Sequence, residues 1–145
     1  MIRSRRDIRA PSHVVHELIT DVETWCLWSP HVAAVDPPIG RLAAGWSGKV
    51  RAWFAPATTM TVIWAEPGRG MGWETPALGH VLVYDQRIEP GENGCRVTFE
   101  AHVEGPAGEW ITRLAAPLSS VGQRRRLARL GLLAEWHARH QPSPY

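Results

Sequence analysis

Between residues 32 and 104, apolar and polar residues alternate, and glycine or proline breaks the alternation at short intervals. A repeat of two residues between such breaks is typical of strands in an antiparallel sheet, where one face is buried and the other is solvated. The pattern predicts strands at about residues 32–36, 46–54, 58–66, 70–75, 79–89 and 94–104. Such a sheet needs a second layer to cover its apolar face.

The segments on either side of this run add a strand and the helices. Residues 2–9 form a predicted first strand, and a helix then begins at Ala10-Pro11-Ser12. A second short helix ends at Trp28-Ser29-Pro30, because proline cannot continue it. From Glu109 to about His140 the repeat is helical, and Pro117 is expected to kink or divide that helix. The chain is therefore predicted to be an α+β protein.

Residues 79–89 and 94–104 give the clearest hairpin, since Asn93-Gly94 at the end of their connection favours a tight turn. In the first of these strands, the phase of Leu82 and Ile88 places three polar side chains on the inner face. They are His80, Tyr84 and Gln86. The opposite phase, with Val81 and Val83 inside, is the alternative, because a slip of one residue exchanges the two faces.

Tryptophan usage points to a cavity. The chain has eight Trp, and Trp25 and Trp28 lie three residues apart where a helix should end. Tryptophan is rarely buried completely, so some of these rings are expected to line a hollow, although a core filled with Trp is the alternative. One long helix cannot fill a strongly curved sheet, which leaves space for an apolar small molecule.

Length and composition limit the organisation and location of the protein. The 145 residues fit one domain at 1–140, with a disordered tail at 141–145. A net charge of +2 gives no reason to expect nucleic acid, and no apolar run approaches the ~18 residues of a membrane span. Cys26 and Cys95 lack CxxC spacing and the N-terminus lacks a signal-peptide pattern, so we expect free thiols in a cytoplasmic protein.

Three stretches carry a family resemblance: Ile8-Arg9-Ala10-Pro11-Ser12-His13-Val14-Val15, the run from Thr20-Asp21 to Ser29-Pro30, and Gly94-Cys95-Arg96-Val97-Thr98-Phe99-Glu100. With the order of elements, they resemble the bacterial polyketide cyclase/dehydrase and lipid-transport proteins of the START and Bet v 1-like (SRPBCC) superfamily. The resemblance implies a helix-grip fold, in which a seven-stranded curved antiparallel sheet wraps around a long C-terminal helix with a cavity between them. Two short helices follow the first strand. The resemblance implies no shared catalytic signature.

Candidate ligand-binding residues follow from strand parity and from aromatic residues near the expected cavity: Trp28, Val50, Phe54, Trp73, His80, Leu82, Tyr84, Gln86, Val97, Phe99, Trp110, Leu114 and Leu118. Catalytic candidates are His80, Tyr84 and Arg51, because imidazole and phenol transfer protons and a guanidinium binds a carboxylate or phenolate. The alternative places all three on the solvated surface. An outward Trp53 and Trp64 would together form an apolar surface for a homodimer.

Other motifs favour ordinary surface roles. His16-Glu17 begins an HExxH pattern, but residue 20 is Thr, so the second metal ligand is missing and we expect neither a metal nor another cofactor. The basic run Arg124-Arg125-Arg126 with Arg129 is interpreted as a solvated helix face.

Three functions follow from these features. The first is binding of a hydrophobic small molecule that is aromatic, polyketide-like or lipid-like. The second is a polyketide aromatase/cyclase or dehydratase that uses inward titratable groups in the same cavity. The third is a regulatory or interaction subunit whose cavity has collapsed around its tryptophans.

Overall fold

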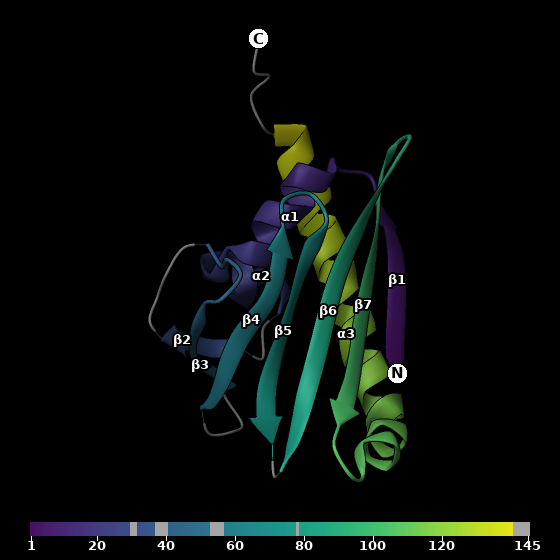
Figure 1. Ribbon diagram of the computed structural model, residues 1–145. Helices are drawn as coiled ribbons and strands as arrows, with labels where there is room; N and C mark the ends of the chain where they lie inside the picture. The colour runs from purple at the N-terminus through teal and green to yellow at the C-terminus, as the bar shows by residue number, and fades with distance from the viewer. Residues whose placement is uncertain (30–31, 37–40, 53–56, 78, 141–145) are drawn as a thin grey trace.

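The computed structural model describes residues 1–29, 32–36, 41–52, 57–77 and 79–140 (Figure 1). The elements in chain order are β1 (Ile2–Ile8), α1 (Ser12–Thr20), the short 3-10 helix η1 (Val22–Thr24), α2 (Trp25–Trp28), β2 (Val32–Asp36), β3 (Ser47–Ala52), β4 (Thr58–Glu66), β5 (Gly70–Ala77), β6 (His80–Gly91), β7 (Gly94–Glu104) and α3 (Gly108–His140). The predicted α+β class, with a curved antiparallel sheet and a long C-terminal helix, is confirmed.

Within the described residues the strands form a seven-stranded sheet in the order β1-β7-β6-β5-β4-β3-β2. Strands β2 to β7 pair with their neighbours in sequence, as antiparallel hairpins do, and β1 joins at the far edge beside β7. The β6–β7 hairpin is the longest, with register from Val81 opposite Glu104 to Gly91 opposite Gly94. The expected helix pair lies between β1 and β2, on the same side of the sheet as α3 (Figure 1).

Helix α3 covers only part of the sheet. It packs against β1 and β7 and against α1 and α2, at one side of the curved layer. Leu127, Leu130 and Ala134 on its C-terminal half are buried in the main core. At Gly131 an added Cβ would lie 2.9 Å from Arg6 Nε, so α3 passes close to the Arg6 side chain of β1 at this point.

The N-terminal half of α3 differs from the prediction. Trp110, Leu114 and Leu118 are 71%, 74% and 83% exposed, so they face solvent instead of the sheet. The helix also continues through Pro117 without dividing. The inward row of this half carries small or polar residues such as Thr112 and Gln123, which are buried. Hydrophobicity alone therefore selects the wrong face, because the correct face borders a cavity and not a packed core.

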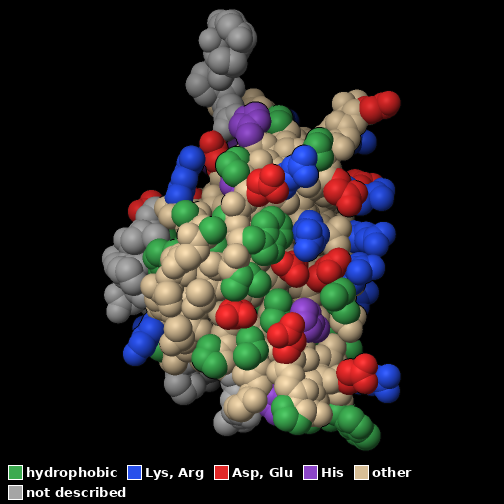
Figure 2. Space-filling view, viewed as in Figure 1, with side chains coloured by type: hydrophobic (Ala, Val, Ile, Leu, Met, Phe, Trp, Pro, Cys, Tyr) green, Lys and Arg blue, Asp and Glu red, His purple; other side chains and the backbone are tan. Residues whose placement is uncertain are grey.

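The outer face of the sheet is charged towards its β1 edge. Two ion pairs join β1 to β7, Arg3 Nε to Glu100 Oε1 at 3.0 Å and Arg96 Nε to Asp7 Oδ1 at 2.9 Å. Figure 2 shows acidic and basic side chains gathered over this part of the molecule. Solvation and charge on an edge strand discourage pairing with another chain.

Candidate functional site

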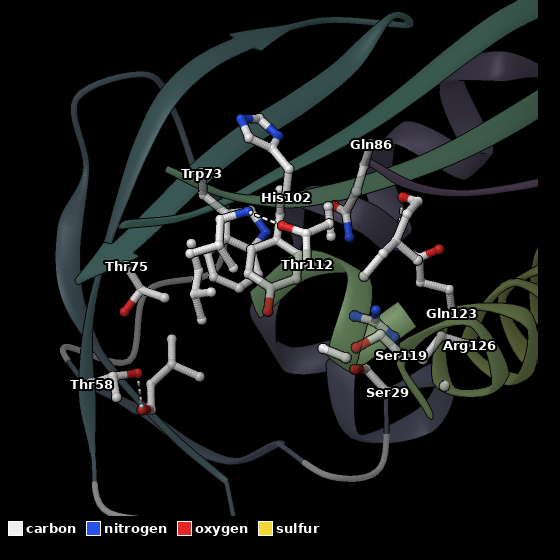
Figure 3. A pocket seen from close by; sticks show the side chains of 18 of the residues that line it. Ser29, Thr58, Trp73, Thr75, Gln86, His102, Thr112, Ser119, Gln123 and Arg126 are labelled. Carbon is white, nitrogen blue, oxygen red and sulfur yellow. Dashed lines mark hydrogen bonds between the residues drawn. The ribbon is translucent and has the colours of Figure 1, made fainter. Parts of the chain in front are cut away.

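A pocket of about 540 Å³ lies between the sheet and the N-terminal half of α3 (Figure 3). It opens where α3 leaves β3 to β6 uncovered, because the helix packs towards β1 and β7. The lining residues are Ile2, Trp25, Trp28, Ser29, Val50, Thr58, Trp73, Thr75, Pro76, Leu82, Tyr84, Gln86, Ala101, His102, Val103, Ile111, Thr112, Ala115, Ser119, Gly122, Gln123 and Arg126.

Two aromatic side chains form a flat wall of this pocket. Trp73 on β5 and Tyr84 on β6 are directly opposite in the strand register, and their rings stack with centroids 4.2 Å apart and an interplanar angle of 16°. Cross-strand neighbours on one face lie close enough for such stacking. The pair gives the pocket an apolar surface suited to a planar group.

Trp28 forms a second aromatic wall from the helix side. Its indole N–H donates to the carbonyl of Leu18 at 3.2 Å, and the Trp25 N–H donates to that of Ile19 at 2.9 Å. Backbone carbonyls at the end of α1 thus satisfy both polar atoms and fix the rings. Trp28 also contacts Phe99, with centroids 6.1 Å apart, so the pocket wall continues into the core.

Arg126 on α3 brings a cation into the pocket wall. Its guanidinium lies 5.6 Å from the centre of the Phe99 ring, and the side chain is labelled with Gln123 and Ser119 in Figure 3. Burial lowers the pKa of Arg126, and the nearby Tyr84 opposes that shift. In the described part of the chain, no carboxylate forms an ion pair with it.

The phenol of Tyr84 stays neutral in the pocket. Burial raises its pKa, and the Arg126 charge offsets only part of that effect. A neutral phenol beside a guanidinium can donate a hydrogen bond to a carbonyl or carboxylate oxygen.

Two further polar atoms in the lining have no hydrogen-bond partner. They are Thr75 Oγ1 and Gln86 Oε1, on side chains that are 6% and 5% exposed. Buried polar atoms are normally paired, so these two can form hydrogen bonds with a molecule in the pocket. Gln123 differs, because its amide is already bonded to Ser4 Oγ and to the Ile2 carbonyl.

The predicted site residues divide into four groups. Trp28, Val50, Trp73, Leu82, Tyr84 and Gln86 line the pocket. Val97 and Phe99 point to the same side of the sheet but are buried in the core, next to the end of the pocket. Phe54 and Trp53 lie outside the described residues.

The remaining candidates lie elsewhere, which corrects the expected grouping. His80 begins β6 outside the lining, and its Nε2 accepts a hydrogen bond from the Ala107 N–H at 3.2 Å, near the start of α3. Arg51 is exposed and also outside the lining, which matches its surface alternative. The exposed Trp110, Leu114 and Leu118 do not reach the pocket either.

Trp46 and Trp64 have separate environments. Trp46 is partly buried against the core. The Trp64 N–H donates to Asp85 Oδ1 at 2.7 Å, and the Arg87 guanidinium lies 5.1 Å from the Trp64 ring centre. These contacts cover part of Trp64, so it does not form a bare apolar face by itself.

Arg126 is the main residue that the sequence pattern misassigned. It belongs to a basic run whose neighbours Arg124 and Arg125 are exposed, and only its helical phase separates it from them. Gln123 and Arg126 lie three residues apart on one face of α3, which is the signal that could have identified both. His102 also lines the pocket, but its Nε2 is 3.1 Å from Glu104 Oε1 and its imidazole points away from the labelled pocket residues (Figure 3).

Within the described residues, no helix has the length and apolarity needed to cross a membrane. The same residues contain no cluster of three or more His, Cys, Asp or Glu with the arrangement of a metal site.

Comparisons with solved structures agree with this fold. A protein from Mesorhizobium loti has 15% identity and a TM-score of 0.74, with 97% of this chain and 98% of that chain covered. A Colwellia psychrerythraea protein described as the Aha1 dimer has 16% identity and a TM-score of 0.67, with 92% and 95% covered. DynU16, a protein of the dynemicin biosynthetic locus, has 18% identity and a TM-score of 0.70. That match covers 99% of this chain, which spans 49% of DynU16.

The family assignment comes from the sequence match. No curated protein matches the chain. The family model described as polyketide cyclase/dehydrase and lipid transport matches residues 2–135, nearly the whole chain. The order of elements, the cavity beside the C-terminal helix and this match agree. The chain therefore belongs to the polyketide cyclase/dehydrase and lipid transport family.

Proposed function

We propose that this protein binds a hydrophobic small molecule in the pocket between the sheet and α3. The observation that carries the proposal is the open cavity of about 540 Å³ with aromatic walls. Its volume falls within the range of about 300–1,000 Å³ that is common for small-molecule sites. A collapsed interaction subunit would have its tryptophans filling this space, so the cavity favours binding over the regulatory alternative.

The chemistry of the walls supports an aromatic or polyketide-like ligand. The stacked Trp73 and Tyr84 offer a planar apolar surface, and Trp28 lines the pocket from α2. Aromatic surfaces bind planar groups through apolar contact and offset stacking. A few polar atoms among apolar walls then set the orientation of the bound molecule.

Native mass spectrometry of the purified protein tests the proposal, together with a tryptophan-fluorescence titration against hydrophobic ligands. We expect a co-purifying small molecule or a saturable fluorescence change. Trp73→Ala should weaken binding about tenfold, because it removes the stacked wall. Trp110→Ala is the matched control, since Trp110 is 71% exposed outside the pocket. Apoprotein alone, with unchanged fluorescence across the panel, would contradict the proposal.

A cyclase or dehydratase activity is the second candidate, and the placement of Tyr84 beside Arg126 favours it. A neutral phenol and a guanidinium can both stabilise negative charge that develops on a substrate carbonyl oxygen. Tyr84→Phe keeps the stacked ring and removes the hydroxyl. An enzyme would lose turnover of a linear poly-β-ketone thioester with little change in binding, whereas a carrier would show no turnover in either form.

A homodimer is also predicted for this protein. The exposed row Trp110, Leu114 and Leu118 on α3 supports such a contact, and one similar structure is described as a dimer. Sedimentation velocity tests this prediction. The wild type should sediment as a dimer, and the Leu114→Glu variant should sediment as a monomer. A wild type that is monomeric at high micromolar concentration would contradict a dimer.

A further inference from the structure

The Arg126 side chain places a cation in the pocket, and no carboxylate of the described residues forms an ion pair with it. In the described residues its guanidinium lies over the Phe99 ring at 5.6 Å, and it shares the pocket lining with Tyr84. A charge removed from water is unfavourable unless it is paired with an opposite charge. We propose that the ligand is a carboxylate, an apolar planar acid whose ionised group pairs with Arg126. This inference rests on the proposed binding function.

A second observation points to polar ligand groups at the same end of the pocket. Gln86 is 5% exposed and its Oε1 has no partner. It lies directly opposite Phe99 in the β6–β7 register, and Arg126 lies over that same ring. Gln86 from β6 and Arg126 from α3 therefore border the same end of the pocket from opposite walls (Figure 3).

The order of residues along β6 sets the orientation of the acid. Gln86 lies at the Arg126 end, Tyr84 comes next with its stacked partner Trp73, and Leu82 follows towards the other end. A carboxylate at Arg126 would therefore place an attached ring system along the Trp73–Tyr84 wall. The neutral phenol of Tyr84 can donate a further hydrogen bond to the carboxylate.

The guanidinium suits this role chemically. Arginine stays charged in proteins, and its planar fork matches the two oxygens of a carboxylate. Charge pairing in a partly enclosed pocket is stronger than on the exposed surface. The proposal therefore predicts selectivity for the ionised acid over a neutral molecule of the same shape.

Two probes of equal shape test this selectivity: 2-naphthoate and 2-naphthamide, titrated at pH 7 and low salt by calorimetry. We expect the wild type to bind the acid at least about tenfold more tightly than the amide. Arg126→Gln should remove this preference by weakening only the acid. Arg125→Gln is the matched control, because Arg125 is the adjacent and exposed residue of the same basic run.

The outcomes separate this inference from the proposed function. If the wild type binds acid and amide equally, the carboxylate inference is wrong and the binding function stands. If neither naphthalene probe nor dodecanoate binds, the proposed function itself fails. An Arg125→Gln variant that loses the acid as Arg126→Gln does would show general surface attraction and overturn the site. The wild-type comparison decides the question even if Arg126→Gln does not fold.

Discussion

Ser4 Oγ on β1 donates a 2.9 Å hydrogen bond to Gln123 Oε1 on α3, in the buried layer beside the pocket. The Gln123 amide nitrogen also donates to the Ile2 carbonyl at 3.3 Å. One glutamine thus joins the edge strand to the long helix, at the boundary between the core and the cavity. Both residues are buried, so neither can replace this bond with water at no cost.

Removing this bond should destabilise the protein. Gln123→Leu leaves the Ser4 hydroxyl and the Ile2 carbonyl without their partner, and we expect the free energy of unfolding to fall by about 1–3 kcal/mol. Gln86→Leu is the matched control, because Gln86 Oε1 has no partner to lose, and it should leave stability unchanged or slightly higher. Urea unfolding measures both variants. Equal losses in the two would show that the Ser4 bond adds nothing specific.

Gly70, at the start of β5, lies against the backbone of β6. It has φ +121°, and an added Cβ would lie 1.8 Å from the Gln86 carbonyl oxygen, which is backbone and cannot move aside. Gly70→Ala should therefore cost about 3 kcal/mol or more in unfolding free energy. Gly68→Ala, at φ +74° with open space around it, should cost about 1 kcal/mol. Similar melting temperatures for the two variants would contradict the close approach.

The C-terminal half of α3 anchors the helix to the sheet. Leu130 is fully buried, so Leu130→Ala should lower the unfolding free energy by about 2–5 kcal/mol. Leu132, two residues along the same helix, is 64% exposed, and Leu132→Ala should change it by about 0.5 kcal/mol or less. Guanidinium unfolding of both variants tests this difference. A comparable loss in the Leu132 variant would mean that α3 has another orientation.

His16 should make stability depend on pH. Burial lowers the pKa of His16 from 6.5, the Arg41 charge lowers it further and Glu17 partly opposes them. Below pH 6.5 the unfolded chain therefore takes up a proton that the folded protein resists, so stability falls as the pH decreases through this range. Because His16 is only half-buried, the slope should stay below the limit of about 1.4 kcal/mol per pH unit for one group.

Thermal melting at pH 7.5 and 5.5 checks this expectation. His16→Gln should lose part of the pH dependence, whereas His13→Gln, at an exposed position on the same helix, should retain it. If the wild type and His16→Gln show the same difference between the two pH values, the desolvated imidazole is not the cause.

The strands were predictable because successive side chains point to opposite faces of the sheet, so buried and exposed residues alternate along the sequence. On β6, Leu82, Tyr84 and Gln86 face the pocket, the side that the parity of Leu82 and Ile88 indicated. On β7, Ala101 and Val103 line the pocket, while Val97 and Phe99 pack in the core. Strand parity therefore predicts which face of the sheet borders the pocket, but not how far the pocket extends along the strand. Where the cavity stops depends on the position of α3, which is a tertiary property.

The helix side of the site was not predictable from the same rule. A helix that borders a cavity loses the apolar stripe that marks a core-facing row, and here the inward row carries Ser119, Gln123 and Arg126. The most apolar row instead contains Trp110, Leu114 and Leu118, which are exposed. An arginine that faces the pocket from within a basic run has no distinct sequence signal except its helical phase.

The two halves of α3 therefore have different structural roles. Leu127, Leu130 and Ala134 hold the scaffold, whereas Ile111, Ala115 and Ser119 border the cavity. Substitutions along the cavity row can accumulate in a lineage without disturbing the anchor. A family built on this plan can diversify what it captures while its architecture is inherited unchanged.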